Sequence, residues 1–166
     1  FSFFTIYLDK PFKSGDYVII NDLQSGTIKH IGLKSTRIKT LKGDELIIPN
    51  QSITKSIINN YKRMKNRRVD FDLSIAYDTP QNKIKKIPAL IATIIQQVPN
   101  IKFVHCKLCR LDEYSIIYTC AYTIDNSDYE IYLNIREEIL LKILASFQKN
   151  RIALAYPTQS ILLNKK

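Results

Sequence analysis

The stretch 69-VDFDLSIAY-77 is the clearest structural signal in this sequence. Its odd-numbered positions are apolar or aromatic, and its even-numbered positions are polar or small. Because side chains alternate between the two faces of a β-strand, this pattern predicts a strand with one covered face. The next residues, DTP at 78–80, predict a helix start, with Thr79 as the N-cap and Pro80 at the first helical position.

The chain that follows alternates between helical and extended patterns. An apolar helical stripe runs over 84–98, in which Pro88 should bend the helix or delay its start. Two strands are expected at 102–111 and 114–124, joined by a two-residue turn at Asp112-Glu113. A second amphipathic helix at about 128–148 and a strand at 151–156 complete the order βαββαβ. Residues 69–156 are therefore predicted to form a ferredoxin-like α+β domain.

Residues 9–61 show short strands separated by turns instead. Strands are expected at 16–20, 27–31, 33–40 and 45–49, with turn signals at 21–26, Gly32 and 41–44. Several short strands joined by tight turns favour a small β-barrel or sandwich. A domain of about 50 residues buries little apolar surface, so packing against neighbours would help it.

Half of the net charge of +10 lies in one short segment, 62-KRMKNRR-68, which has five basic residues and no acidic one. A general nucleic-acid binder would more often spread its basic residues over a face. The segment also lacks interleaved aromatic residues, which weakens a single-strand nucleic-acid interpretation. It is predicted to be a charged linker between two units, either simply solvated or able to attract anions.

The first eight residues, FSFFTIYL, are mostly apolar, and the chain begins with Phe rather than Met. This favours a chain cut from a longer protein, with residues 1–8 as the end of a membrane helix. No window reaches the roughly 18 consecutive apolar residues of a spanning helix. Three cysteines without a paired framework favour a reducing compartment.

Few residues suggest chemistry. Cys106 and Cys109 form a C-x-x-C, but on a strand they point to opposite faces and cannot share one metal ion. The two-residue turn would place Cys120 opposite His105, and no second C-x-x-C completes a site. His30 has no nearby Asp or Cys in sequence. No nucleophile elbow or phosphate loop is present, so the chain is predicted not to be an enzyme and to need no cofactor or metal.

Three ordered motifs carry a family resemblance. They are DKPFKSGDYV at 9–18, GTIKHIGLKSTRIKTLKGDELIIPN at 26–50 and YPTQS at 156–160. In this order they resemble the small-conductance mechanosensitive ion channels of the MscS type. The motifs cover most of 9–61 and reappear at 156–159. Residues 69–150 resemble the family in their pattern of apolar and polar residues more than in residue identity.

The resemblance implies an architecture. Residues 1–8 would end the pore-lining helix, 9–61 would form a small Sm-like β-barrel domain, and 62–68 would be a basic linker. The ferredoxin-like domain at 69–156 and a C-terminal barrel strand at 157–166 would follow. Twelve motif residues would be structural: Pro11, Phe12, Gly15, Asp16, Gly26, Gly32, Thr36, Gly43, Pro49, Asn50, Tyr156 and Pro157.

The resemblance also implies a function. Seven copies would form a hollow vestibule with side portals on the cytoplasmic side of the cell membrane, below a pore that opens under membrane tension. Ions and small solutes would leave through it on hypo-osmotic shock. The expected partners are other copies of the chain, ions and solutes, and the lipid bilayer through upstream helices, with no nucleic acid. Five residues are hypothesised to lie near the portals and favour anions: Lys62, Arg63, Lys65, Arg67 and Arg68.

Two alternatives remain open on the residues alone. A soluble Sm-like RNA-binding module using the basic segment would bind polynucleotides with a steep salt dependence. A redox or metal module at Cys106 and Cys109 would be revealed by metal analysis of the purified protein.

Overall fold

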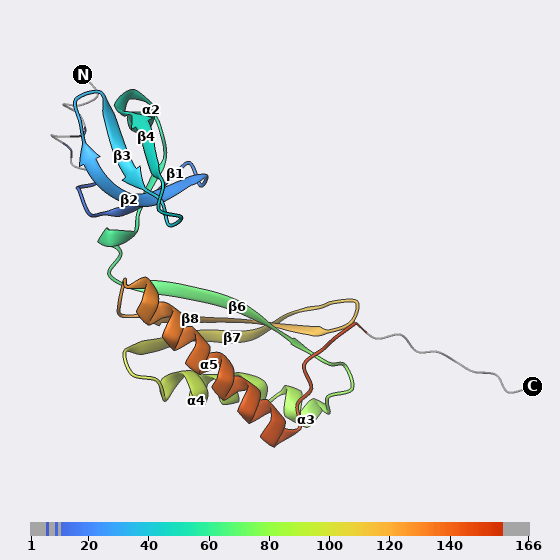
Figure 1. Cartoon of the computed structure of the whole chain (residues 1–166). Coiled ribbons are helices and arrows are strands. Elements are labelled where there is room, and N and C mark those ends of the chain that lie inside the picture. Colours follow the sequence, from blue (N-terminus) through green and yellow to red (C-terminus); the bar gives the residue numbers. More distant parts are fainter. Residues whose placement is uncertain (1–5, 7–8, 10, 158–166) are drawn as a thin grey trace, which may run out of the picture. The chain divides into compact units, whose positions relative to one another are not determined.

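A computed structural model describes Ile6, Asp9 and residues 11–157, which divide into two compact units, Phe1–Met64 and Lys65–Lys166 (Figure 1). The expected end of a pore helix at 1–8 and barrel strand at 157–166 lie almost entirely outside the described residues. Within the described part of the chain, no helix has both the length and the apolar character needed to cross a bilayer.

The first unit is a five-stranded antiparallel sheet with the order β4-β3-β2-β1-β5. Its strands are β1 (Tyr17–Ile20), β2 (Gln24–Ile31), β3 (Ser35–Lys39), β4 (Glu45–Pro49) and β5 (Ile58–Asn60). A short helix α2 (Asn50–Thr54) and a 3₁₀ helix η1 (Tyr61–Arg63) flank β5. The small β fold is confirmed, but β2 begins inside the expected turn at 21–26, and sequence reasoning missed α2 and β5.

One buried cluster fills this unit. Its members come from β1 to β4, from α2 and from the segment before the sheet: Ile6, Phe12, Val18, Ile20, Ile28, Ile38, Ile48 and Ile53. Gly26 lies close to the neighbouring backbone, and a Cβ built there would stand 2.4 Å from the Lys39 carbonyl oxygen. Only glycine therefore allows β2 to pass this close to the end of β3.

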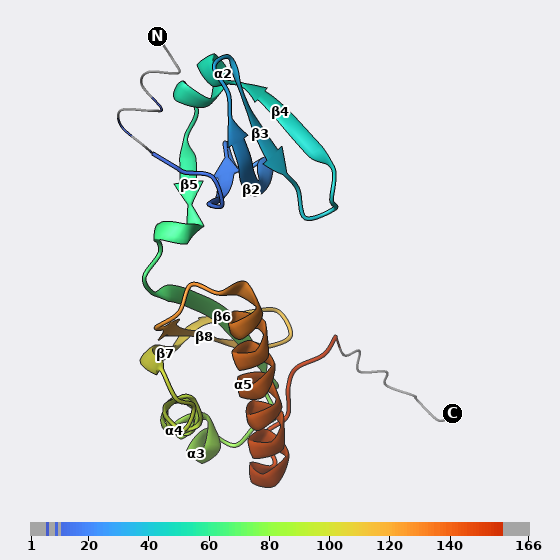
Figure 2. The ribbon, with the colours of Figure 1, turned by 60° about the vertical axis from the view of Figure 1, so that its left-hand side comes forward.

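The second unit packs two helices on one face of a three-stranded antiparallel sheet (Figures 1 and 2). The strands are β6 (Arg67–Ile75), β7 (Ile101–Leu111) and β8 (Ile116–Ile124), in the order β6-β8-β7. The helices are α3 (Gln81–Ile84), α4 (Ile87–Gln96) and α5 (Tyr129–Asn150), of which α4 and α5 cover the sheet.

The chain after α5 returns to the free edge of β6. Leu154 forms an antiparallel bridge with Ile75, and the Ala155 amide donates to the Ser74 carbonyl at 2.8 Å. The expected strand at 151–156 is thus reduced to a single bridge, yet it occupies the fourth position of the sheet. The ferredoxin-like order is confirmed, with the alternating residues Val69, Leu73 and Ile75 buried against the helices.

The helix region agrees with the sequence in one respect and differs in another. Pro88 lies in the first turn of α4, and the helical stretch is interrupted between Ile84 and Ile87, as its ring requires. Thr79 is not the N-cap that was expected. Pro80 occupies that position without a side-chain cap bond, and the Thr79 side chain is buried instead.

The β7–β8 hairpin has a longer turn than Asp112-Glu113. The Asp112 amide donates to the Ser115 carbonyl at 2.8 Å, so the turn occupies 112–115. The register of β7 also shifts between Phe103 and His105 and again between Leu108 and Arg110. The longer turn and the bulge at Cys109 together bring Cys120 opposite Cys106. The expected pairing of Cys120 with His105 is therefore wrong.

Candidate functional site: the basic segment and its anchors

Asp16 organises the start of the first unit. Its Oδ2 atom accepts hydrogen bonds from the Lys13 amide at 3.0 Å and from the Asn60 side-chain amide at 2.8 Å. Gly15 precedes it with a φ of +90°, a backbone conformation that a side chain would strain. The Asn60 amide also donates to the Pro11 carbonyl at 3.1 Å. The motif Pro11 to Asp16 is thereby tied to the end of β5.

Asn60 in turn sets the direction in which the basic segment leaves the first unit. Its Oδ1 atom accepts from the Lys62 amide at 3.1 Å, which makes Asn60 the N-cap of η1. The η1 turn carries Lys62 and Arg63, both exposed. A chain of contacts therefore runs from Asp16 through Asn60 to the first two cations of the segment.

A second group of motif residues holds the turn between β2 and β3. The Thr36 hydroxyl donates to Asn50 Oδ1 at 2.8 Å, and the Asn50 amide donates to the Gly32 carbonyl at 2.8 Å. Thr36 and Asn50 are 0% and 1% exposed. Because a buried polar group needs partners, these two side chains specify the turn conformation as a pair. The structural role that the resemblance implies for them stays a prediction.

Arg67 and Arg68, the last two cations of the segment, begin strand β6 and are not part of a free linker. Arg67 is half-buried, and its guanidinium lies 5.8 Å from the ring centre of Tyr129 and 5.0 Å from that of Tyr132. It also donates to the Ser127 carbonyl at 3.2 Å. Arg67 therefore holds the start of β6 against the first turn of α5.

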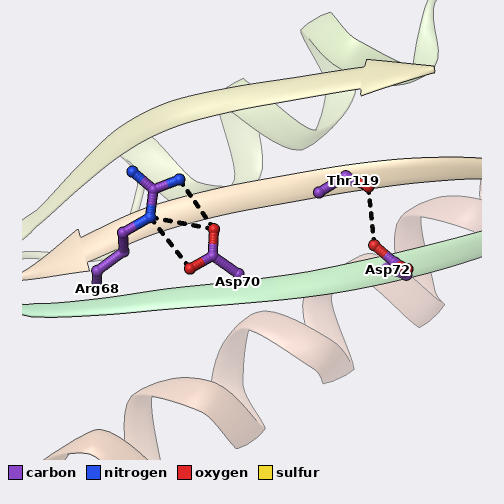
Figure 3. A network of polar contacts seen from close by, with 4 residues as sticks. All are labelled: Arg68, Asp70, Asp72 and Thr119. Atoms are coloured by element: carbon purple, nitrogen blue, oxygen red, sulfur yellow. Dashed lines mark hydrogen bonds and ion pairs between the residues drawn. The ribbon is translucent and has the colours of Figure 1, made fainter. Parts of the chain in front are cut away.

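Arg68 is paired with a carboxylate on its own strand (Figure 3). Its Nε atom donates to both oxygens of Asp70 at 3.1 Å, and a terminal nitrogen donates to Oδ1 at 2.9 Å. These hydrogen bonds hold the pKa of the Asp70 carboxyl below its usual range and raise the pKa of Arg68. Asp72, two residues along, accepts from the Thr119 hydroxyl at 2.9 Å.

The five cations are consequently not equivalent. Lys62 and Lys65 are exposed and form no ion pair among the described residues, whereas the charge of Arg68 is balanced by Asp70. Lysine ammonium groups on flexible stems act as mobile point charges for passing anions. The structure thus separates two solvent-facing lysines from two arginines that are held by their own unit.

The remaining predicted residues fall in ordinary structural positions. Gly43 has a φ of +96° in the turn before β4, and Pro49 immediately precedes α2. Tyr156 and Pro157 are exposed near the end of the described residues. Cys106 is buried, whereas Cys109 is exposed and lies where the register of β7 is interrupted.

Sequence reasoning missed the residues that hold the cations in place. Asn60 ends the short stretch INN, which has neither the length nor the alternation of a recognisable strand. Tyr129 and Tyr132 lie more than 60 residues after Arg67, so only the fold reveals their contact. The Arg68–Asp70 pair did have a signal, because residues two apart on a strand share a face.

Two family models match the chain along almost all of its length. The model described as "Mechanosensitive ion channel, beta-domain" matches residues 1–63. The model described as "Mechanosensitive ion channel MscS, C-terminal" matches residues 69–154. The first match ends inside the basic segment, at residue 63, and the second begins directly after it, at residue 69.

Curated relatives match in sequence. An uncharacterized MscS family protein of Aquifex aeolicus is 32% identical over 163 residues, covering 96% of this chain and 44% of the relative. The small-conductance mechanosensitive channel MscMJ of Methanocaldococcus jannaschii is 32% identical over 161 residues, covering 96% of this chain and 46% of the relative. The chain spans just under half the length of these two relatives.

Solved structures match in fold. The crystal structure of Helicobacter pylori MscS in a closed state has a TM-score of 0.82 at 20% identity, covering 99% of this chain and 64% of that one. The cryo-EM structure of Arabidopsis thaliana MSL1 has a TM-score of 0.83 at 19% identity, covering 95% of this chain and 57% of that one.

Proposed function

The chain belongs to the family of MscS-type mechanosensitive ion channels, which is not an enzyme family, and from that premise we propose that it forms the vestibule region of such a channel. The vestibule would lie on the cytoplasmic side of the cell membrane. The pore above it would open under membrane tension and release ions and small solutes on hypo-osmotic shock. The family membership of both units is the observation that carries this proposal.

The physical basis of gating requires no ligand. Tension favours whichever channel state occupies more membrane area, and it shifts the population by the work done on that area difference. The part of the chain before the junction at Pro11 would connect to the pore. Assembly of copies, proposed to be seven, would enclose the vestibule, and the terminal strand proposed at 157–166 would join them.

The basic segment would supply the charge of the side portals. Charge near a narrow opening changes the local concentration of ions of each sign. The contacts from Asp16 through Asn60 hold Lys62 at a defined exit from the first unit. We expect Lys62 and Lys65 to contribute more to an anion preference than Arg67 and Arg68, whose guanidinium groups are engaged within the second unit.

The test is the reversal potential of the full-length channel in a salt gradient. Replacing Lys62, Arg63, Lys65, Arg67 and Arg68 together by Gln should shift it toward cations. The pair Lys62→Gln/Lys65→Gln should reproduce most of that shift, and Arg67→Gln/Arg68→Gln should reproduce little. A matched control is Lys85→Gln/Lys86→Gln, which removes two exposed positive charges from between α3 and α4.

The outcomes separate two claims. If the full-length protein gives no tension-activated current at all, that result contradicts the channel role. A channel that gates normally, yet keeps its reversal potential in the fivefold variant, contradicts only the portal charges. Strong salt-dependent binding to RNA by the full chain would instead support the soluble RNA-binding alternative.

A further inference from the structure

Two buried thiols face each other in the core of the second unit. Cys106 on β7 and Cys120 on β8 are directly opposite in the strand register. Their sulfur atoms are 3.2 Å apart, and the residues are 2% and 0% exposed. Both thiols are free, and both belong to the cluster that α4 and α5 cover. The family assignment and the proposed portal charges make no use of this pair.

The positions of the two cysteines suit a disulfide. Residues directly opposite in an antiparallel pair have Cα atoms about 4.5–5.5 Å apart. Disulfides span Cα separations of about 4.4–6.8 Å. A bond between the two sulfurs therefore needs only a side-chain adjustment and no rearrangement of the sheet.

We propose that Cys106 and Cys120 are an oxidisable dithiol, a modification site at which a hydroperoxide joins β7 to β8 through a disulfide. The Cys106 sulfur attacks the distal peroxide oxygen and the O–O bond breaks, so that Cys106 becomes a sulfenic acid and an alcohol or water leaves. The Cys120 thiol then attacks the Cys106 sulfur, forming the S–S bond and releasing water. The two thiols lose two protons and two electrons, and the hydroperoxide accepts them.

The surroundings assign the two roles. The hydrogen bond from Cys120 lowers the pKa of Cys106, and the positive charge of Lys107 acts in the same direction. The pKa of Cys120 is raised, chiefly by that same contact. A thiolate is the form that attacks a peroxide, so Cys106 is the attacking residue and Cys120 the resolving one.

Access depends on the position of β7. The strand is at the edge of the three-stranded sheet, and its register is interrupted at Val104 and Cys109, on both sides of Cys106. Edge strands with irregular pairing open more readily than central ones. Oxidation should therefore be slower than that of an exposed thiol, and its rate should increase under mild denaturant.

Cys109 is the natural control. It is exposed, and it lies at the second of the two register interruptions of β7, away from the Cys106–Cys120 pairing. Cys109→Ser therefore removes the one exposed thiol among the three cysteines without touching the buried pair.

The sequence makes the linkage easy to map. Cleavage after Lys102, Lys107, Arg110 and Arg136 places each cysteine in its own tryptic peptide, 103–107, 108–110 and 111–136. The full chain carrying Cys109→Ser is treated with hydrogen peroxide, unfolded, alkylated and digested without reductant. We expect peptides 103–107 and 111–136 to appear as one linked species, with both thiols lost together and restored by dithiothreitol.

A second measurement tests the order of the steps. In Cys120→Ala the resolving thiol is gone, so a dimedone label should accumulate on Cys106 after peroxide treatment. The proposal is overturned if Cys106 and Cys120 both stay fully alkylatable when peroxide treatment is continued, in mild denaturant, well beyond the time that oxidises Cys109 in the parent chain. It is equally overturned if the linked species joins two different chains. The peptide mapping uses the Cys109→Ser chain, so its result holds even if the Cys120→Ala chain does not fold.

Discussion

Single side chains decide which charges of the basic segment reach solution. Arg68 illustrates this, because three hydrogen bonds commit its guanidinium to Asp70. Both side chains are 53% exposed, so water and salt screen the pair, and its contribution to stability is small. Its effect is on charge instead: the pair presents no net charge, whereas Lys62 and Lys65 present two.

This pairing predicts a measurable titration. The pKa of Asp70 is lowered in the folded state, so its stabilising effect is present above the ordinary Asp value of about 3.9. It is lost as the pH falls through the lower, folded-state value, because protonation then favours the unfolded chain. NMR titration of Asp70 should show a pKa that rises toward the ordinary value in Arg68→Gln. An Asp70 pKa that is the same in both proteins would contradict the pair, and Arg37→Gln is a control at an exposed arginine of the first unit.

Residue-level prediction from sequence was limited by distance along the chain. The motif residues Asp16, Gly32, Thr36 and Asn50 were named from the sequence, but their hydrogen bonds were not, and Asn60 was not named at all. Only the folded backbone brings these partners together. The five cations were recognised as a group. Arg67 contacts Tyr129 and Tyr132 because of the way α5 packs, and no local sequence pattern predicts that packing.

At the scale of strands and helices, regular local sequence patterns predicted the elements correctly. The alternation at 69–77 predicted β6 nearly to its ends, and Pro88 predicted the break before α4. The expected β7–β8 register was wrong because the turn is longer than Asp112-Glu113 and because the bulges at Val104 and Cys109 leave no mark in the sequence. A bulge adds one residue to one strand, so every pairing beyond it moves by one position.

Gly26 and Gly43 allow a prediction about strand packing. Gly26→Ala puts a methyl group 2.4 Å from the Lys39 carbonyl oxygen, which is backbone and cannot rotate away. We expect the free energy of unfolding of the first unit to fall by about 2–3 kcal/mol, the upper part of the range for overpacking. Gly43→Ala has no atom within 4 Å of the new Cβ and carries only the strain of its φ of +96°, about 1–2 kcal/mol.

Urea denaturation followed by the fluorescence of the tyrosines measures both variants. The order of the two losses is the decisive result, because both variants make the same chemical change in the same unit, one in strand β2 and one in the turn before β4. Equal losses for Gly26→Ala and Gly43→Ala would mean that β2 moves away from β3 without penalty.

At the scale of the whole molecule, the chain has two cores rather than one. The first is built around Phe12 and the isoleucines of β1 to β4, and the second lies between the β6-β8-β7 sheet and helices α4 and α5. The first family model ends at residue 63 and the second begins at residue 69, so each model covers one of the two units. The sequence predicts the domain boundary at 62–68, because the charge of this segment differs from that of both flanks.

Two separate cores predict two separately unfolding units. Asn50→Ala leaves the buried Thr36 hydroxyl and the Gly32 carbonyl unpaired, at about 1–3 kcal/mol for each group. Ile143→Ala opens a cavity under α5, at about 2–5 kcal/mol. Hydrogen exchange of the full chain, resolved by peptide, should show Asn50→Ala speeding exchange in β1 to β5 alone and Ile143→Ala in β6 to α5 alone. If either variant accelerates exchange equally in both units, the two cores unfold as one cooperative body, and their separation in the fold is not a separation in stability.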